Sequence, residues 1–158
     1  MTHNILVSDP ISEKGLQSLI HHPDFNVDFK SGLTEKELVD IIPNYQGLIV
    51  RSQTQVTESI INHASNLKVI ARAGVGVDNI DIKSATLNGI LVVNAPDGNT
   101  ISATEHSVAM ILAMARNIPQ AYTSLKNKEW NRKAFKGVEL YQKVLGVIGA
   151  GRIGLGVA

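Results

Sequence analysis

The 158-residue chain contains no cysteine. This absence excludes disulfides, thiolate catalysis and cysteine-ligated metals, and it suits the cytoplasmic location that we expect. The 15 basic and 14 acidic side chains form no runs, so neither nucleic acid nor an anionic membrane is a predicted partner. No apolar run approaches the roughly 18 residues needed to span a bilayer. A small-molecule partner is the default expectation.

The five histidines do not predict a metal site. His21 and His22 lie beside Pro23 in a predicted turn and have no carboxylate or histidine partners at metal-ligand spacing, so no metal site is predicted. His106 follows Glu105 on an apolar helical pattern, which favours a packed or capping histidine over a catalytic base.

Short β-rich runs alternate with segments that carry helix-start signals, a pattern typical of an α/β domain with a parallel sheet. Thr34 and Glu37 form a predicted capping box, and Gly89 closes a predicted helix. The predicted strands are 4–7, 25–29, 47–50, 67–71 and 90–93, and the predicted helices include 12–20, 57–64 and 81–88. Together these elements predict one doubly wound layer.

The pattern changes beyond Pro96, where 97–99 reads as a turn. Ser102 and Glu105 form a second predicted capping box, which opens a long apolar helix to Arg116. A domain boundary near residue 98 follows, with a first domain over 1–98 and a second over 99–158. A further helix is predicted over 119–127 and a buried strand over 144–148, with an exposed-looking Trp130 between them.

Directly after the predicted strand 144–148 comes a G-x-G-x-x-G pattern formed by Gly149, Gly151 and Gly154. The first glycine permits a tight turn, the second lets the backbone approach a pyrophosphate, and the third lets the new helix lie close to the sheet. The alternative is a glycine-rich turn that only packs tightly. The acidic residue expected about 20 positions later would lie beyond Ala158, so the pattern leaves NAD and NADP open.

Polar residues follow three predicted strands, at the edge where open α/β sheets bind ligands. Arg51 and Ser52 follow one strand, Arg72 and the 74–76 turn follow the next, and Asn94 the last. Arginine offers a permanent charge for carboxylate or phosphate, and hydroxyl and amide groups can hold oxyanions. Alternatively, the arginines pair with surface acids and the glycines only turn the chain.

Several segments in this order and spacing resemble the D-2-hydroxyacid dehydrogenase family: 51–54, 72–81, 89–100, 102–106 and the glycine pattern at 149–154. The resemblance covers nearly the whole chain, and 72–99 is most similar to the phosphoglycerate-oxidising members. It implies a flavodoxin-like substrate domain with a parallel sheet over 1–98, followed by the start of a Rossmann NAD-binding domain over 99–158.

The same resemblance implies two groups of site residues and NAD as the cofactor. The substrate-binding group would be Arg51, Ser52, Gly74, Val75, Gly76 and Asn99. The cofactor-binding group would be Val75, Gly149, Gly151, Arg152, Ile153 and Gly154. A small 2-hydroxy acid or 2-keto acid is the implied substrate class, and a homo-oligomer through Ala103–Tyr141 is the implied assembly.

The implied reaction is hydride transfer between NAD and 3-phosphoglycerate, which belongs to serine synthesis. Glyoxylate or hydroxypyruvate reduction is the alternative within the family, and a non-catalytic binding or dimerisation module is the alternative outside it. No residue of this chain matches the family's catalytic histidine, glutamate or arginine. We therefore expect the catalytic residues beyond Ala158 and expect the chain to be a truncated, inactive fragment.

Overall fold

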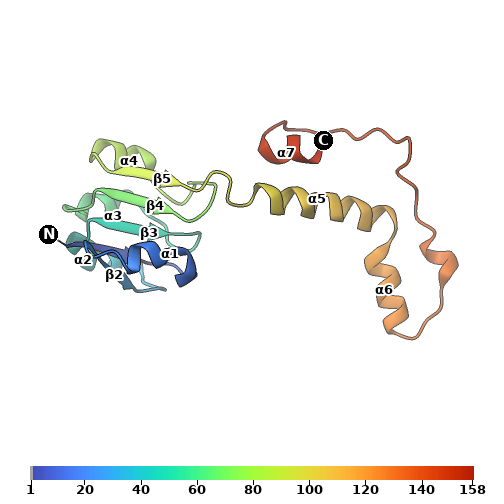
Figure 1. Cartoon of the computed structure of the whole chain (residues 1–158), viewed down its shortest axis with the longest axis horizontal. Helices are drawn as coiled ribbons and strands as arrows, with labels where there is room; N and C mark the ends of the chain where they lie inside the picture. The colour runs from blue at the N-terminus through green and yellow to red at the C-terminus, as the bar shows by residue number, and fades with distance from the viewer. Residues whose placement is uncertain (1) are drawn as a thin grey trace. The chain divides into compact units, whose positions relative to one another are not determined.

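The computed structural model describes residues 2–158, which form two compact units. The first unit ends at Gly98 and the second begins at Asn99. The first unit is built on a parallel sheet with the strand order β2-β1-β3-β4-β5 (Figure 1). Its strands are β1 (His3–Val7), β2 (Phe25–Phe29), β3 (Gly47–Val50), β4 (Val69–Arg72) and β5 (Leu91–Asn94). This flavodoxin-like order confirms the predicted α/β fold class.

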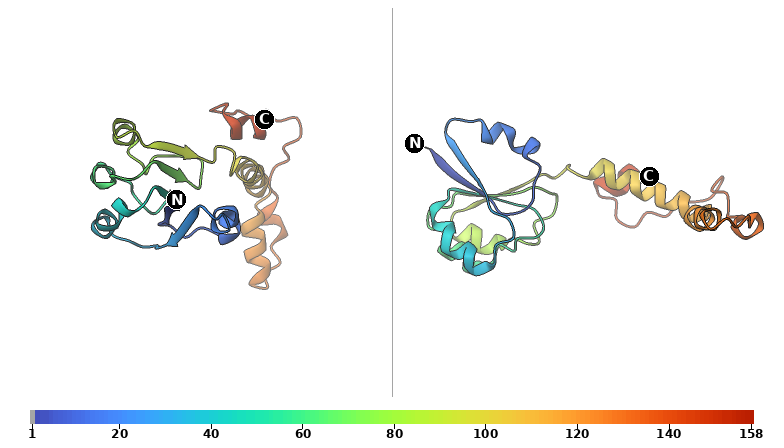
Figure 2. Two further views of the ribbon diagram at one scale, coloured as in Figure 1. Left: turned by 60° about the vertical axis from the view of Figure 1, so that its left-hand side comes forward. Right: turned by 90° about the horizontal axis from the view of Figure 1, so that it is seen from below.

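Helices cover both faces of this sheet, as Figure 2 shows in its right-hand view. On one face α1 (Glu13–Ile20) packs through Leu16 against Ile5, Val7 and Ile49. The opposite face is covered by α2 (Glu35–Ile41), the 3₁₀ turn η1 (Ile42–Asn44), α3 (Glu58–His63) and α4 (Ile82–Leu87). The larger core lies on that side and includes Leu6, Leu38, Leu48, Ile60 and Ile70. Strand residues alternate between the two cores because successive side chains point to opposite faces.

The helix starts of the first unit follow their capping residues. Thr34 and Glu37 form the predicted capping box at α2, since the Thr34 hydroxyl accepts from the Glu37 amide and Glu37 accepts from the Thr34 amide. Asp81 caps α4 by accepting a 2.9 Å hydrogen bond from the Ser84 amide. Ser12 precedes α1 as predicted, but its side chain makes no capping bond. Gly89 adopts a φ of +67° after α4, a conformation that favours glycine.

The second unit contains α5 (Thr100–Ala115), α6 (Ile118–Lys126), the 3₁₀ turn η2 (Arg132–Phe135) and α7 (Arg152–Val157). The predicted capping box of Ser102 and Glu105 is wrong, because α5 already begins at Thr100 with Asn99 in the N-cap position. Ser102 is thus part of the first helical turn, where its hydroxyl cannot serve as an N-cap. The predicted end at Arg116 is confirmed, since Arg116 is the C-cap.

The predicted strand 144–148 is also wrong, because these residues form no regular element. Val144 is 96% exposed and Ile148 is fully exposed. A parallel strand is stable only when neighbouring strands satisfy its backbone groups, and the described part of the second unit contains no other strand. The helix that follows, α7, packs instead on α5, where Gly156 lies against Thr104.

None of the helices within residues 2–158 is both long enough and apolar enough to cross a bilayer.

Candidate functional site

The carboxyl ends of three neighbouring strands bring the predicted site segments of the first unit together. Val50 pairs in register with Arg72, and Arg72 pairs with Asn94, so β3, β4 and β5 end level with one another. The loops that follow these strands therefore start side by side at one edge of the sheet. Open α/β sheets bind their ligands at this edge.

Arg51 and Ser52 follow β3 and are exposed. Within the described residues the Arg51 guanidinium makes no hydrogen bond or ion pair, and the Ser52 amide and hydroxyl have no partner either. The alternative in which the arginines pair with surface acids is therefore wrong for Arg51. It is wrong for Arg72 as well, whose Nε donates to the Arg51 carbonyl and to Asn79 Oδ1, both at 3.1 Å.

The turn after β4 presents two further donors. The Gly74 amide is engaged, because it donates to the Arg72 carbonyl at 2.8 Å. The amides of Val75 and Gly76 have no acceptor within residues 2–158. Asn94 holds the turn through a 2.7 Å hydrogen bond from its Nδ2 to the Val75 carbonyl. Of the three amides that the resemblance implied, two are thus open to a ligand.

Sequence reasoning missed two buried residues that hold these loops. Asp9, two residues after β1, is 3% exposed and accepts hydrogen bonds from the amides of Arg51 (2.6 Å), Gln53 (3.1 Å) and Thr54 (3.0 Å). Asn79 is 5% exposed and donates to the carbonyls of Arg51 and Thr54. The position of Asp9 at a strand end could have pointed to it. Asn79 lies within the 72–81 segment that resembles the family, but that resemblance implied no role for it.

The edge is rich in donors and contains no histidine of the first unit. His3 lies at the start of β1, His21 and His22 precede β2, and His63 ends α3. All four are therefore at the amino ends of the strands, opposite Arg51 and the 74–76 turn. His106 lies on α5, in the second unit, where it is exposed. Among residues 2–158 no group of three or more histidine, aspartate or glutamate side chains could hold a metal ion.

Tyr45 is a buried titratable residue, 4% exposed, just before the amino end of β3. Burial raises the pKa of Tyr45, and the hydrogen bond from its hydroxyl to Asp28 Oδ2 (2.8 Å) acts in the same direction. Lys30 donates to the Tyr45 hydroxyl at 3.2 Å, and this bond raises the pKa of Lys30. The three residues tie the end of β2 to the chain that enters β3, which is a structural role.

The second unit contains the glycine fingerprint. Gly149 has a φ of +96°, which the tight turn requires. A Cβ at Gly154 would collide with the Gly149 carbonyl, so the turn closes tightly onto α7. Gly151 is the N-cap of α7, and Arg152 and Ile153 form its first turn. Asn99 is the N-cap of α5 and makes no side-chain capping bond.

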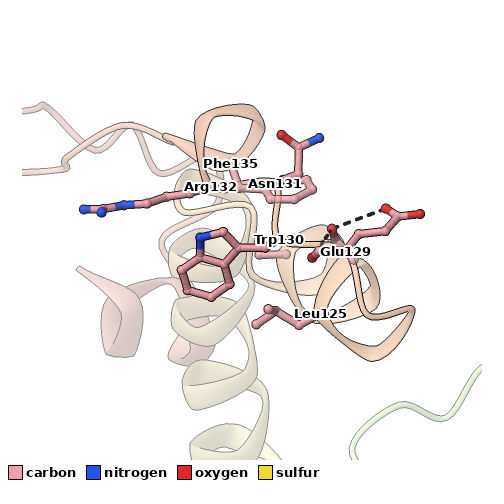
Figure 3. Close-up of a pocket in the computed structure, with 8 residues that line it drawn as sticks. Leu125, Glu129, Trp130, Asn131, Arg132 and Phe135 are labelled. Carbon is pink, nitrogen blue, oxygen red and sulfur yellow. Dashed lines mark hydrogen bonds between the residues drawn. The ribbon is translucent and has the colours of Figure 1, made fainter.

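The second unit also has an apolar cavity of about 230 Å³ around Trp130. Figure 3 shows Trp130 with Leu125, Arg132 and Phe135 among the residues that line it. The Ser124 hydroxyl donates to the Glu129 carbonyl at 3.1 Å and so fixes the chain beside the cavity. Trp130 is 80% exposed, which confirms the expectation that it lies at the surface.

Comparison with known proteins identifies the family. The sequence profile of the D-isomer specific 2-hydroxyacid dehydrogenase catalytic domain matches residues 5–144. The chain belongs to this family. Its relatives include D-3-phosphoglycerate dehydrogenases from Methanocaldococcus jannaschii, 55% identical over 150 residues, and from Synechocystis, 53% identical over 154 residues. These alignments cover 95% and 98% of the chain but only 28% and 27% of the relatives, so the chain spans just over a quarter of their length.

Solved structures of this dehydrogenase family share the fold. The structure of an NAD⁺-bound 3-phosphoglycerate dehydrogenase from Entamoeba histolytica superposes with a TM-score of 0.76 at 29% identity. The comparison covers 99% of this chain and 49% of that protein. The resemblance inferred from the motifs is thus confirmed at the level of family and fold.

Proposed function

We propose that this chain supplies the substrate-binding part of an NAD-dependent dehydrogenase that oxidises D-3-phosphoglycerate to 3-phosphohydroxypyruvate, a step of serine synthesis. The proposal rests on the donor-rich edge after β3 and β4, where the Arg51 guanidinium and the Ser52, Val75 and Gly76 amides have no partner within the described chain. The names of the relatives support this substrate over other 2-hydroxy acids.

Each group at the edge suits one part of such a substrate. Arg51 carries a charge that cannot be titrated away and a planar fork that matches phosphate or carboxylate, so we assign it to the charged end. The successive amides of Val75 and Gly76 can both donate to one carboxylate. Ser52 adds a hydroxyl and an amide beside Arg51. In this assignment the Asn99 side chain also contacts the substrate.

The complete reaction removes two hydrogens from the substrate, one as a hydride and one as a proton. Oxidation removes the hydrogen on C2 as a hydride and the hydroxyl hydrogen as a proton, so that C2 becomes a carbonyl. NAD supplies the hydride acceptor when it is bound. Within residues 2–158 we assign no residue to the proton transfer, because the histidines of the first unit lie at the opposite edge of the sheet.

The fingerprint of the second unit fits a dinucleotide pyrophosphate. The positive φ of Gly149 and the clash that a Cβ at Gly154 would make with the Gly149 carbonyl show a tight turn that depends on glycine, as a pyrophosphate-binding turn does. Gly151, Arg152 and Ile153 would hold the pyrophosphate at this turn, and Val75 would contribute a backbone or apolar contact to the cofactor.

Binding to the 158-residue chain tests the substrate assignment. We expect calorimetry to detect D-3-phosphoglycerate and to find weaker binding of D-glycerate, which lacks the phosphate that Arg51 would hold. Glyoxylate serves as the comparison for the alternative reductase activity. Tighter binding of glyoxylate than of phosphoglycerate would favour that alternative, and binding of neither compound would contradict the proposal.

We further propose that the chain forms a homo-oligomer through Ala103–Tyr141. Large apolar side chains are exposed along this segment, including Met110, Met114, Leu125 and Trp130. Exposed apolar surface of this extent promotes association. A cytoplasmic location completes the proposal, and cell fractionation tests it.

A further inference from the structure

Asp9 and Asn79 hold several backbone amides and carbonyls of the loop after β3 before any ligand arrives. Asp9 accepts from the amides of Arg51, Gln53 and Thr54, and from the Thr54 hydroxyl at 2.5 Å. Four donors satisfy a carboxylate that is almost completely buried, as a buried charge requires. Among the amides of 51–54, the Ser52 amide has no partner within the described residues.

Asn79 holds the carbonyl groups of the same loop. Its Nδ2 donates to the Arg51 carbonyl at 3.1 Å and to the Thr54 carbonyl at 2.7 Å, while its Oδ1 accepts from Arg72 Nε. Three of the four hydrogen bonds that an asparagine amide can make are therefore formed. This one side chain joins the loop after β3 to the arginine that ends β4.

The backbone of Asn79 is itself fixed. The Val56 amide donates to the Asn79 carbonyl at 2.8 Å, and the Asp81 amide donates to the Val56 carbonyl at 2.9 Å. These bonds form an isolated parallel bridge between Val56 and Ile80. The bridge therefore fixes the backbone of Asn79, so that its side chain can position the loop.

These contacts favour the binding of an anionic ligand at the edge. A carbonyl oxygen carries partial negative charge, and two carbonyls of the loop are bonded to the Asn79 amide instead of facing the edge where Arg51, Val75 and Gly76 present donors. A loop that is ordered beforehand also avoids the entropic cost of ordering on binding. Without Asn79, the Thr54 carbonyl would lose this partner and the Arg51 carbonyl would keep only Arg72 Nε, so both advantages would be weakened while the donors themselves remained.

We propose that Asn79 is a positioning residue that sets the affinity of this edge for an anionic 2-hydroxy acid, by fixing the Arg51 and Thr54 carbonyls and the Arg72 guanidinium. Its role rests on the proposed function, because the ligand is the substrate assigned there. Asn79 would act through Arg51 and Ser52, without contacting the ligand.

The test substitutes Asn79→Ser in the 158-residue chain, with Asn88→Ser as the matched control. Asn88 also donates through its amide, to the Ser84 carbonyl at 3.0 Å, but it lies at the end of α4 near the amino ends of the strands. Asn79→Gln keeps the amide one methylene further out and is the conservative variant if the serine variant does not fold. Calorimetry with D-3-phosphoglycerate and hydrogen-exchange mass spectrometry over 51–54 provide the two measurements.

We expect Asn79→Ser to weaken phosphoglycerate binding by about ten-fold or more, the loss that follows from one or two hydrogen bonds. Exchange of the 51–54 amides should rise by a similar factor, on the order of ten-fold. Asn88→Ser should change neither, and Asn79→Gln should lie between. If Asn79 were purely structural, its substitution would lower the melting temperature without selectively changing phosphoglycerate affinity and exchange over 51–54.

Unchanged affinity and unchanged exchange in Asn79→Ser or Asn79→Gln would overturn the inference. Failure of the unsubstituted chain to bind phosphoglycerate would contradict the proposed function instead. In that case exchange over 51–54 still decides the positioning role, because loop order does not depend on the ligand.

Discussion

Arg51 is exposed and permanently charged, and its guanidinium has no hydrogen-bond or ion-pair partner within the described residues. None of the described acids contacts this guanidinium. Asp9 lies close in the fold, but its carboxylate bonds the backbone of the loop rather than the Arg51 side chain. The guanidinium is therefore available for an anionic ligand.

In an active enzyme containing this chain, Arg51→Ala should raise the KM for phosphoglycerate about 10- to 100-fold, the effect of losing hydrogen bonds to a charged group. The kcat should fall much less, because Arg51 holds a remote charge that is present in ground and transition states alike. Steady-state kinetics measure both constants. Lys68→Ala removes the same charge at the opposite, amino edge of the sheet and is the control. An equal loss confined to kcat would contradict this assignment.

The sequence predicted the residues that follow a strand directly and could not predict those that act through tertiary contacts. Arg51, Ser52 and the 74–76 turn were identified because strand ends of a parallel sheet meet at one edge. Asn79 bonds a carbonyl 28 positions away, and Asp9 bonds an amide 42 positions away. Such pairings depend on how the loops cross, which no local pattern contains.

Helix caps are the elements whose strength depends most directly on pH in this chain. The hydrogen bond from the Ser84 amide lowers the pKa of Asp81 at the start of α4, and the bonds from Thr34 lower the pKa of Glu37 at α2. A carboxylate whose folded pKa lies below its unfolded value stabilises the fold above the unfolded pKa. That stabilisation is lost as the pH falls through the folded pKa.

We expect Asp81→Asn to remove part of the acid sensitivity of the fold. Asparagine still caps the helix but cannot be protonated. Near neutral pH, the original chain should therefore have the larger free energy of unfolding, and this gap should be at its maximum there. The gap should shrink as the pH falls below the ordinary value of 3.8. Urea midpoints at several pH values measure it, and Asp40→Asn provides the baseline for an exposed carboxylate of α2. A gap that does not change with pH would refute this account.

The helices and strands of the first unit could be predicted because their apolar residues pack into cores formed within the same unit. β2 and β3 begin and end at the predicted residues, and the other three strands shift by only one or two positions at an end. Residues 144–148 have an equally apolar pattern but do not form a strand, because the described second unit offers no partner strand. Local pattern predicts what a segment can form, and the available neighbours decide whether it forms.

The two units differ in how well their apolar side chains are covered. The first unit contains most of the buried core residues, whereas the second exposes Ile101 (69%) and Met114 (76%) on α5 as well as Trp130. A helix that is apolar on most sides requires cover from another surface. A second copy of the chain could supply that cover through the same segment, as a two-fold contact requires.

Light scattering at micromolar concentration should therefore give a mass near twice 17.0 kDa, or larger, for the isolated chain. Met114→Glu should weaken this association, because it places a charge in the exposed apolar surface. Leu87→Glu changes an equally exposed residue of the first unit and should not. A single species at 17.0 kDa would contradict the proposed contact.

The 158-residue chain by itself should produce no NADH above a blank from phosphoglycerate and NAD. A positioned general base contributes roughly 10²- to 10⁴-fold to such reactions, and no histidine of the first unit lies at the donor-rich edge. Absorbance at the NADH band measures the product. Turnover above the blank would show that a described residue performs the proton transfer.

Site-resolved NMR of the isotope-labelled chain tests the central claim, that the edge after β3 and β4 binds the substrate. Titration with D-3-phosphoglycerate should shift the amide signals of Ser52, Val75 and Gly76, the donors left open in the structure. Signals of His21 and His22 at the amino edge should stay in place. Shifts confined to the amino edge, or no saturable shift at Ser52, Val75 and Gly76, would contradict the account.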